Sequence, residues 1–472
     1  MNDINNLWKK SAEEVLNLLK KKEIKLEELV SSNLQRIEEI NPIVNAIVTL
    51  CRDEAEFLIK NKEAEFKNTL LKGVPVLIKD NTDVKDVKTT YGSELYSEHI
   101  PKESDLVVET LKKRGAIIIG KTNIPEFAAG SHTYNKLFGS TKNPWNLSLS
   151  AGGSSGGSAV ALATGMAWFA TGTDLGGSLR NPSSWCGIVG LRPTPGLVPQ
   201  GPFSFSLSNL SVNGPMARNV TDLSLFLDGM VTHNKRDPFS FKKSDVSYYK
   251  NISEASKKAF NIGFTEDFGV FPCDREIREM TKYTMKLIES LGHNVFDEYP
   301  NVDEAEEAFQ ILRAYLFYSN YKFLLNKKDG LVKEEILWNI KKGKSLSIDH
   351  LVKAENIRKD IYQKTQVFFE KFDFLVVPSS VVTPFDIKET WAKNVEGKKL
   401  NNYVSWLMIA AAVSLTGCPS IAIPTSFSKK GAPIGVQVIA PPHEEKKLLQ
   451  FVKTIEEEIN ISSMIPKNVV SN

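Results

Sequence analysis

The chain has 472 residues, of which 24% are charged and 42% are hydrophobic, and its formal net charge is +3. These proportions are typical of a globular protein and exclude a disordered chain, a collagen and a disulfide scaffold. The small net charge argues against a protein that binds nucleic acid through its overall charge.

The N-terminal part alternates between patterns typical of helices and of strands. Apolar residues at helical spacing predict two amphipathic helices within residues 7–40. Apolar runs at 73–78 and 116–119 predict buried strands, and residues 105–113 between them predict a helix. This alternation predicts an α/β protein with a sheet covered by helices.

The middle of the chain changes from loop to helix. Residues 130–158 are rich in Gly, Ser, Asn and Pro and predict loops, whereas the small residues of 158–171 predict a tightly packed helix. Residues 220–230 predict a further helix. The polar, Lys-rich residues 231–258 predict a surface linker or insertion.

The C-terminal half returns to alternating strands and helices. The predicted elements are a strand at 261–264, a helix at 274–291, a strand at 294–296, three helices between 303 and 372, strands at 374–378, 420–423 and 435–439, and a helix at 444–458.

The N-terminal sequence and the cysteines indicate in which cellular compartment the protein is expected. The N-terminus is polar and lacks the apolar run of a secretory signal, and no apolar run is long enough to span a bilayer. The 4 cysteines are far apart without a C-x-x-C motif, which argues against disulfides and a cysteine zinc site. We therefore expect a cytoplasmic protein with no membrane partner.

One stretch departs from the average composition. The 31 residues between Lys142 and Asp174 carry no charge, although about seven charges are expected at average usage. Residues 143–190 also hold 10 of the 29 glycines. This stretch indicates a site where a ligand approaches the backbone closely.

Three kinds of chemistry fit this stretch poorly. No Lys follows the glycines as a P-loop requires, and the G-x-G-x-x-G pattern of a dinucleotide fingerprint is not met either. Gly153-x-Ser155-x-Gly157 matches a nucleophile elbow, but it follows a loop rather than a strand, and no later His stands in a distinctive context. The 6 histidines are scattered, without metal-ligand spacing.

Serine chemistry with a lysine base fits better. Ser178 follows Gly176 and Gly177, which let substrate approach and let backbone N–H groups turn toward an oxyanion. A lysine base must be neutral, and burial achieves this. Lys79 and Lys121 each end a predicted strand, so position alone does not choose between them.

The surrounding motifs resemble the amidase signature family. The resemblance begins with GGSSGGSA at 152–159 and GTDLGGSLRNPSSWCGIVGLRPT at 172–194. Further segments match in the same order over roughly residues 10 to 460, and they are GVPVLIKDN (73–81), GKTNIPEFA (120–128), NGPMAR (213–218), GCPSIAIPT (417–425) and GVQVIAP (435–441).

The resemblance implies a Ser–cis-Ser–Lys triad. By matching text, the triad is Ser178 as nucleophile, Ser154 as relay and Lys79 as neutral base, with a cis peptide between Gly153 and Ser154. Lys121 is left with a structural role. The backbone N–H groups expected to hold the oxyanion are those of Leu175, Gly176, Gly177 and Ser178, and the backbone at Ala128 is expected to line the substrate site.

The implied fold is a single large domain, residues 1–472, with a central mixed β-sheet covered by helices on both faces. Its signature core is expected at about 70–230, with the insertion at 231–258 and a helical substrate-pocket region at about 300–372. The implied activity is hydrolysis of a linear amide C–N bond through an acyl-enzyme, without metal or organic cofactor. The expected partner is a small-molecule amide rather than nucleic acid, and a homodimer is left open.

Two alternatives remain at the level of sequence. The family also contains the glutamine-hydrolysing subunit of a tRNA-dependent amidotransferase, but Leu175 and the text RPTPGLVPQGP differ from the pattern of that subunit, which favours a stand-alone amidase. A non-catalytic homologue is disfavoured because all three triad positions are present.

For several side chains near the motifs, the sequence allows either a structural role or a direct role at the site. Asp174 and Arg180 are expected to pair and fix the nucleophile loop, and Cys186 is expected to be packed rather than reactive. Other residues could contact substrate or only pack, and these are Phe127, His132, Tyr134 and Phe138, together with the later aromatics Phe309, Tyr315, Phe317, Tyr318, Tyr321, Trp391 and Trp406.

Overall fold

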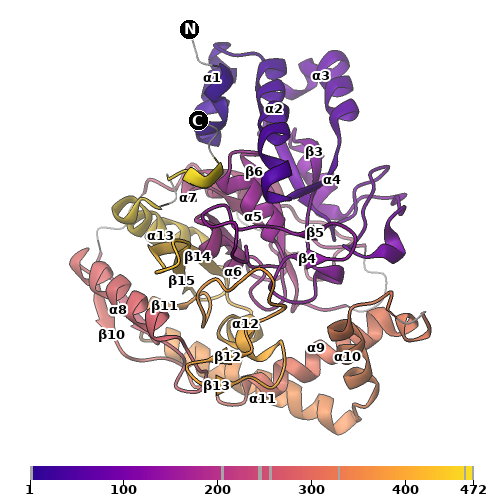
Figure 1. Ribbon diagram of the computed structural model, residues 1–472. Helices are drawn as coiled ribbons and strands as arrows, with labels where there is room; N and C mark the ends of the chain where they lie inside the picture. The colour runs from indigo at the N-terminus through magenta and orange to yellow at the C-terminus, as the bar shows by residue number, and fades with distance from the viewer. Residues whose placement is uncertain are drawn as a thin grey trace.

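A mixed sheet of eleven strands runs through the protein (Figure 1). The computed structural model describes residues 4–202, 207–242, 247–254, 258–327, 330–461 and 464–469. Across the sheet the strands follow the order β1-β3-β2-β6-β8-β7-β14-β15-β11-β9-β10. Parallel neighbours such as β2 and β6 adjoin antiparallel neighbours such as β6 and β8, so the sheet is mixed as the resemblance implied.

The strands of the large sheet have the following bounds: β1 Ile47–Leu50, β2 Pro75–Lys79, β3 Ile117–Thr122, β6 Phe169–Asp174, β7 Val189–Arg192, β8 Val212–Ala217, β9 Asn261–Phe264, β10 Asn294–Phe296, β11 Phe374–Pro378, β14 Ser420–Phe427 and β15 Pro433–Ile439. Two short antiparallel pairs lie outside it, β4 Tyr134–Asn135 with β5 Gly139–Ser140, and β12 Asn394–Val395 with β13 Lys398–Lys399.

The α-helices have the following bounds: α1 Ala12–Lys21, α2 Leu26–Val44, α3 Arg52–Phe66, α4 Leu106–Lys113, α5 Gly156–Ala163, α6 Arg180–Cys186, α7 Val220–Met230, α8 Arg275–Ser290, α9 Ala305–Tyr321, α10 Glu334–Lys344, α11 Ile348–Phe369, α12 Met408–Leu415 and α13 Glu445–Ile459.

Helices flank the sheet on both faces. Helices α7 and α13 pack on β8 and β14, while α5, α6 and α8 pack on β6, β14 and β15. Helices α1 to α3 form the top of the molecule in Figure 1, and α9 to α11 form its base. The described part of the chain is therefore an α/β protein of the predicted class.

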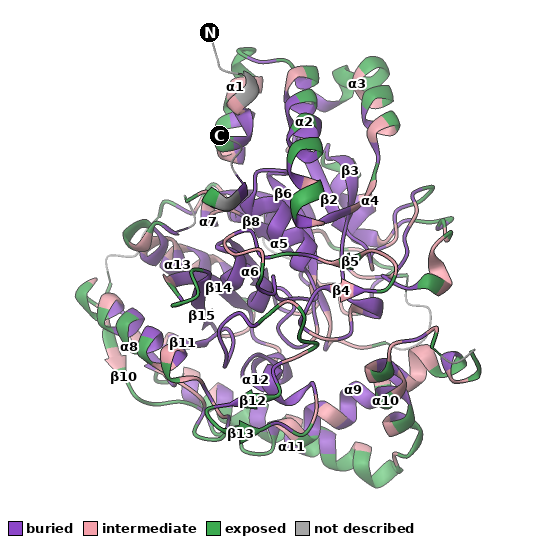
Figure 2. Cartoon of the chain, viewed as in Figure 1, coloured by how far each residue is buried: buried purple, intermediate pink, exposed green. Residues whose placement is uncertain are grey.

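The centre of the molecule is closely packed. Every residue of β2, β7 and β11 is buried, as is every residue of the small helix α5 (Figure 2). Helix α5 consists of Gly, Ser, Ala, Val and Leu, and a Cβ at Gly157 would lie 2.4 Å from the backbone nitrogen of Asn123. Small residues therefore allow this helix to lie against the strands that carry the site.

Most predicted elements are confirmed, but the helix predicted at 158–171 is wrong in its second half. Helix α5 ends at Ala163, and Phe169–Asp174 forms strand β6. Gly165 has a φ of +77° and lies against Trp8, which ends the helical course. The following residues then pair with β2 and β8, so tertiary hydrogen bonds override the local helical pattern.

The segment predicted as a linker or insertion carries no helix or strand within 231–242 and 247–254, its described parts. It is nevertheless anchored, because Tyr248 and Ile252 are buried in the core. The backbone N–H of Tyr248 also donates to a carboxylate oxygen of Asp228 at 2.9 Å. This segment therefore packs on the sheet-covering helix α7 rather than bridging two units.

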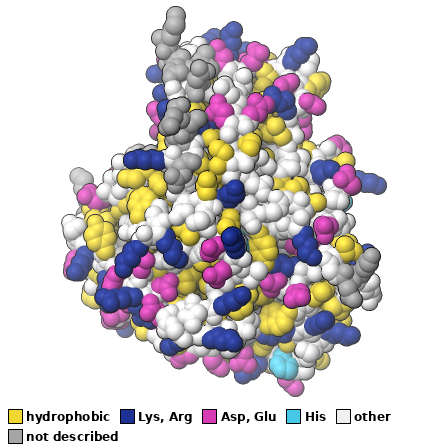
Figure 3. Space-filling model, viewed as in Figure 1, with side chains coloured by type: hydrophobic (Ala, Val, Ile, Leu, Met, Phe, Trp, Pro, Cys, Tyr) yellow, Lys and Arg dark blue, Asp and Glu magenta, His cyan; other side chains and the backbone are white. Residues whose placement is uncertain are grey.

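The surface carries mixed charge. On the face seen in Figure 3, Lys and Arg side chains are interspersed with Asp and Glu. Among the helices of the described residues, none combines the length and the apolar content that a bilayer crossing requires.

Candidate active site

The site lies at the carboxyl ends of two neighbouring parallel strands. Strand β2 ends at Lys79 and strand β6 ends at Asp174, and the two strands pair through Val76 with Phe169. Because parallel strands end at the same edge of a sheet, Lys79 is brought beside Thr173 and the glycine-rich loop that follows β6.

Lys79 is fully buried and its ammonium nitrogen contacts only short polar groups. Nζ lies 2.7 Å from Ser154 Oγ, 2.7 Å from Thr173 Oγ1 and 3.4 Å from the Thr173 carbonyl oxygen. Burial holds the pKa of Lys79 well below its usual range, with a smaller opposing effect from the Asp174 carboxylate. A lysine in this environment is suited to act as a neutral base.

Ser154 stands on a sharply bent segment before α5. The peptide bond between Gly153 and Ser154 is cis, as the resemblance implied. The carbonyl of Gly152 accepts hydrogen bonds from the backbone N–H and the hydroxyl of Thr133, and Gly153 N–H donates to Asn181 Oδ1 at 3.2 Å. These contacts hold the Ser154 hydroxyl against Lys79.

Ser178 lies in the loop between β6 and α6, and its side chain is only 9% exposed. The Asp174 carboxylate organises this loop, accepting the N–H of Gly177 at 2.9 Å and that of Leu179 at 3.0 Å. In this structure the Gly177 N–H, which was expected at the oxyanion, donates to Asp174. The N–H groups of Leu175, Gly176 and Ser178 remain as candidate oxyanion donors.

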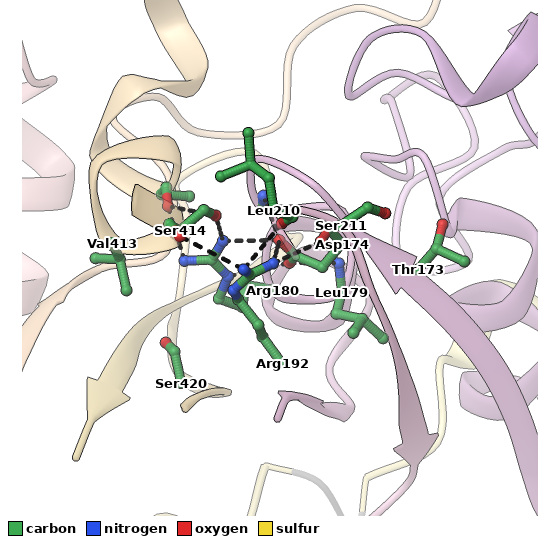
Figure 4. A network of polar contacts seen from close by, with 12 residues as sticks. Thr173, Asp174, Leu179, Arg180, Arg192, Leu210, Ser211, Val413, Ser414 and Ser420 are labelled. Carbon is green, nitrogen blue, oxygen red and sulfur yellow. Dashed lines mark hydrogen bonds and ion pairs between the residues drawn. The ribbon is translucent and has the colours of Figure 1, made fainter. Parts of the chain in front are cut away.

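Asp174 is in turn held by two buried arginines (Figure 4). Arg180 binds both carboxylate oxygens, with Nη2 2.8 Å from Oδ1 and Nε 3.0 Å from Oδ2. Arg192 Nη1 lies 3.3 Å from Oδ1. Burial alone would raise the pKa of Asp174, but these guanidinium groups hold it well below its usual range.

The predicted pairing of Asp174 with Arg180 is therefore confirmed, and Arg192 is an additional partner that sequence reasoning missed. Arg180 also donates to the Ala410 carbonyl, to Gln437 Oε1 and to the Ser414 hydroxyl. The network ties the nucleophile loop to α12 and β15, so its role is to position the loop rather than to contact substrate.

A cavity of about 150 Å³ opens over the two serines. Its lining residues come from the signature motifs and from helix α9, and they are Asn81, Phe127, Ala128, Ser154, Thr173, Leu175, Ser178, Ser211, Arg313, Leu316, Phe317, Asn320 and Tyr321. Ser154, Ser178, Leu175 and Ala128 were all predicted at this site, whereas Asn81 and Thr173 were not.

Helix α9 forms one wall of the cavity. Its lining residues are Arg313, Leu316, Phe317, Asn320 and Tyr321, which recur at helical spacing along one face. Phe309 lies one turn earlier and packs against Gly176, where a Cβ would lie 2.8 Å from the Phe309 ring. Within the predicted pocket region 300–372, this helix is the part that reaches the site.

Sequence reasoning noticed the aromatic residues of α9 but missed Arg313. A signal was present, because Arg313 is four residues from both Phe309 and Phe317 and so is a lone charge on an apolar helix face. Of the other aromatics, Tyr315 and Tyr318 do not line this cavity, and Trp406 is buried in the core.

Four side chains near the motifs were expected either to contact substrate or only to pack, and the structure distinguishes between these roles. Phe127 lines the cavity, whereas His132, Tyr134 and Phe138 do not. His132 lies between the Ser150 hydroxyl and the Ile387 carbonyl, at 2.7 and 3.0 Å, and burial lowers its pKa to about 4. Tyr134 lies beneath the Lys333 ammonium group, which is 4.1 Å from the ring centroid.

Lys121, the competing lysine, has the structural role that was expected. Its Nζ donates to the Thr82 carbonyl at 2.7 Å and to Thr89 Oγ1 at 2.6 Å, and it lies 3.6 Å from Asp80 Oδ1. Cys186 is fully buried, and burial raises the pKa of its thiol, so it is packed as predicted.

The competing chemistries find little support in the geometry. Ser155, the central residue of the nucleophile-elbow match, is buried, with its hydroxyl 3.4 Å from the Thr173 backbone. Within the described ranges, no group of three or more His, Cys, Asp or Glu is arranged to hold a metal ion.

Comparison with known proteins gives consistent results. The family model described as Amidase matches residues 28–449. A glutamyl-tRNA(Gln) amidotransferase subunit of Thermoanaerobacter pseudethanolicus is 33% identical over 482 residues, which cover 96% of this chain and 96% of that protein.

Two solved structures share the fold over nearly the whole chain. A 6-aminohexanoate cyclic dimer hydrolase, complexed with substrate, has a TM-score of 0.89 at 25% identity and covers 98% of this chain and 100% of its own. A glutamyl-tRNA(Gln) amidotransferase subunit from Thermotoga maritima has a TM-score of 0.81 at 27% identity and covers 100% and 99%.

Proposed function

The chain belongs to the amidase signature family and is an amidohydrolase that acts on amide C–N bonds, and we propose that Ser178, Ser154 and Lys79 carry out its reaction. The observation that carries the proposal is the contact of a buried lysine with Ser154, 2.7 Å away, below a cavity that Ser154 and Ser178 line together. The roles follow from the chemistry that each group can perform.

The first step forms an acyl-enzyme. Ser178 Oγ attacks the amide carbonyl carbon while its proton passes to Ser154, whose own proton passes to neutral Lys79 Nζ. The C–N bond then breaks, and the leaving nitrogen takes a proton back through the same relay. The products of this step are the free amine or ammonia and an ester on Ser178.

The second step returns the enzyme to its starting state. A water molecule attacks the ester carbonyl and gives its proton to the relay, and the carboxylic acid leaves as the Ser178 hydroxyl is re-formed. In both steps the N–H groups of Leu175, Gly176 and Ser178 are the proposed donors to the oxyanion. Each step uses groups of this chain and water, so the proposal requires no cofactor.

The substrate is proposed to be a small-molecule amide taken by the isolated protein. The cavity of about 150 Å³ suits a small acyl or amine group. The higher TM-score with the cyclic dimer hydrolase, 0.89 against 0.81, and the apolar Leu175 side chain in the cavity support a stand-alone enzyme.

A second candidate is a glutamine-hydrolysing subunit that acts with partner subunits. It is supported by the 33% identity with a glutamyl-tRNA(Gln) amidotransferase subunit over nearly the full length of both chains. The two candidates differ in one observable: a stand-alone amidase turns over simple amides without a partner, whereas a subunit needs its partners for efficient glutamine hydrolysis.

The experiment is a substrate panel on the purified chain. Acetamide, aryl amides, amino-acid amides and glutamine are assayed for ammonia or amine release, and the acyl-enzyme is sought by mass spectrometry after rapid acid quench. Ser178→Ala is expected to abolish turnover and the acyl adduct, while Ser155→Ala is the matched control. An adduct that persists in Ser178→Ala contradicts the assignment of the nucleophile.

The proposal also covers the cellular compartment and the oligomeric state of the protein. The 4 cysteines are free and buried, which supports residence in a reducing compartment such as the cytoplasm. A homodimer is compatible with the proposal, because every proposed catalytic group belongs to one chain, and light scattering of the purified protein measures the oligomeric state.

A further inference from the structure

One wall of the cavity holds a buried cation that has no anionic partner among the described residues. Arg313 lines the cavity from helix α9, and its side chain is only 4% exposed. Its Nη1 has no hydrogen-bond partner within the part of the chain that the structure describes. A buried guanidinium with unused N–H groups is expensive to maintain, so its surroundings call for an explanation.

The surroundings of Arg313 are aromatic. Its guanidinium carbon lies 4.2 Å from the Phe317 ring centroid and 5.3 Å from that of Tyr403. Burial lowers the pKa of Arg313, and the groups that oppose this effect are the phenols of Tyr403 and Tyr321 rather than a carboxylate. Stacked rings orient a planar guanidinium but do not neutralise its charge.

The other buried arginines of the described residues are all ion-paired. Arg36 lies 3.6 Å from Glu39, Arg180 lies 2.8 Å from Asp174, and Arg192 lies 3.3 Å from Asp174. Arg180 in addition donates to Ala410, Gln437 and Ser414. Arg313 is the exception within the described ranges, and it is the one that lines the cavity over Ser178.

The helical spacing of α9 places Arg313 near the part of the substrate that carries the reacting amide. Phe309 packs against Gly176 in the nucleophile loop, and Arg313 lies one turn further on the same face of α9. Leu316 and Phe317 continue this face along the cavity. A substrate whose amide reaches Ser178 therefore extends along α9 past the guanidinium.

The local charge around Arg313 includes a second cation. Lys333 is close enough for Arg313 to contribute to lowering its pKa, after burial, and the carboxylates of Glu335 and Glu126 oppose that effect. Those two carboxylates face Lys333, whose backbone N–H donates to Glu126 Oε2 at 2.8 Å. The Arg313 guanidinium is left with a hydrogen bond to the phenol of Tyr403 and with no carboxylate partner among the described residues.

We propose that Arg313 binds a carboxylate of the amide substrate, so that the enzyme prefers amides with a negative charge. A carboxylate matches the paired N–H groups of a guanidinium and supplies the missing counter-charge to a buried side chain. The inference rests on the proposed function and names its substrate class. The carboxylate belongs either to the acyl part or to the amine part of the substrate, and the two sources are separated by the test.

The test compares each acidic amide with a neutral amide in which a methyl group replaces the carboxylate. Succinamate is paired with butyramide for the acyl side, and N-acetyl-β-alanine is paired with N-propylacetamide for the amine side. We expect one pair to show an acidic preference of about 10- to 100-fold in kcat/KM, mainly through a lower KM for the acid.

Three variants assign this preference to Arg313. Arg313→Gln is expected to reduce the acid-to-neutral ratio toward one, and Arg313→Lys is expected to retain part of it because the charge remains. Arg275→Gln removes an exposed arginine of α8 as the matched control and is expected to leave the ratio unchanged. A structural role for Arg313 instead lowers the rates with both amides of a pair by the same factor.

A binding measurement keeps this inference separate from the catalytic proposal. Succinate is titrated by calorimetry into Ser178→Ala and into Ser178→Ala with Arg313→Gln. We expect the second protein to bind at least about tenfold more weakly. If no amide is hydrolysed but succinate binding depends on Arg313, the catalytic proposal fails and this one stands. Equal ratios in wild type and Arg313→Gln, or equal succinate affinities, overturn it.

Discussion

Two walls of the same cavity carry buried arginine, and they differ in how its charge is balanced. Behind the nucleophile loop, Arg180 and Arg192 enclose the Asp174 carboxylate, and all three side chains are fully buried (Figure 4). On helix α9, Arg313 lies between aromatic rings without an ion pair among the described residues.

The difference separates buried charge that builds a loop from buried charge that is available to a ligand. Removing one partner of a buried ion pair leaves the other charge uncompensated, which costs about 3–5 kcal/mol of stability. A buried cation without a counter-charge already destabilises the folded state by a similar amount. Its removal is therefore expected to increase the free energy of unfolding or leave it unchanged. The same residue type therefore has opposite expected effects on the two walls.

The largest expected effect is at the nucleophile. Ser178→Ala removes the only oxygen proposed to attack the substrate, and kcat is expected to fall by about 10⁴- to 10⁶-fold. The midpoint of thermal unfolding should change little, because the hydroxyl makes no part of the Asp174 network. Amide turnover and calorimetry measure the two quantities. Retention of more than about 1% of wild-type kcat contradicts the nucleophile assignment.

The next effect is on stability behind the nucleophile loop. Arg180→Leu leaves Asp174 buried with Arg192 as its remaining partner, and the free energy of unfolding is expected to fall by about 3–5 kcal/mol. Denaturant unfolding followed by circular dichroism measures it. A loss of unfolding free energy below about 1 kcal/mol would show that this network does not hold the loop. The proposed difference between the two walls would then be contradicted.

A smaller effect is expected where the two walls touch. A Cβ at Gly176 would lie 2.8 Å from the Phe309 ring, so Gly176→Ala should displace the nucleophile loop or α9 and lower kcat by about 10- to 100-fold. The double variant Gly176→Ala with Phe309→Leu makes room for the methyl group and is expected to recover part of the loss. Failure to recover, with Phe309→Leu alone active, would place the cause elsewhere.

The pH dependence tests the neutral lysine. Burial lowers the pKa of Lys79, so the amine is neutral above that lowered value and protonated below it. Activity is therefore expected to fall as the pH drops, by about tenfold for each pH unit below the pKa of the free enzyme. The residual activity of Lys79→Met should lose this dependence. A flat kcat/KM profile of the wild type from about pH 5 to pH 9 contradicts a titrating lysine base.

The smallest expected effect is the change in stability of Arg313→Leu, and it is the strictest test of the difference between the two walls. Arg313→Leu removes an unpaired buried charge and fills the site with apolar volume, so the free energy of unfolding should change by less than about 1 kcal/mol or increase. The measurement is the same denaturant titration as for Arg180→Leu. A loss similar to that of Arg180→Leu would indicate that Arg313 has a structural role that its contacts do not reveal.

Much of the site could be predicted because its motifs are local. Ser154 and Ser178 stand among glycines that the loop geometry needs, and the text around them is specific enough to identify them. The contact that the Gly177 N–H makes with Asp174 could not be predicted, because it depends on the two arginines that orient the carboxylate. Arg313 was missed because an isolated arginine in a helix carries no motif.

The choice between two lysines illustrates the same limit. Lys79 and Lys121 both follow apolar runs and both are fully buried. Strand β2 lies beside β6, so Lys79 reaches Thr173 and Ser154, whereas Lys121 on β3 reaches Thr82 and Thr89 instead. Strand order, which periodicity does not encode, separates the proposed base from the lysine with a structural role.

The sequence by itself determined the α/β class, most element positions and the family, and it supplied the two serines of the proposed triad, because these depend on local spacing and composition. Tertiary structure alone decided that Phe169–Asp174 is a strand, since β2 and β8 supply its hydrogen-bond partners. It also decided which buried charges are balanced. The Asp174 carboxylate, for example, is reached by Arg192 from strand β7, at 3.3 Å, whereas Arg313 has no ion pair among the described residues.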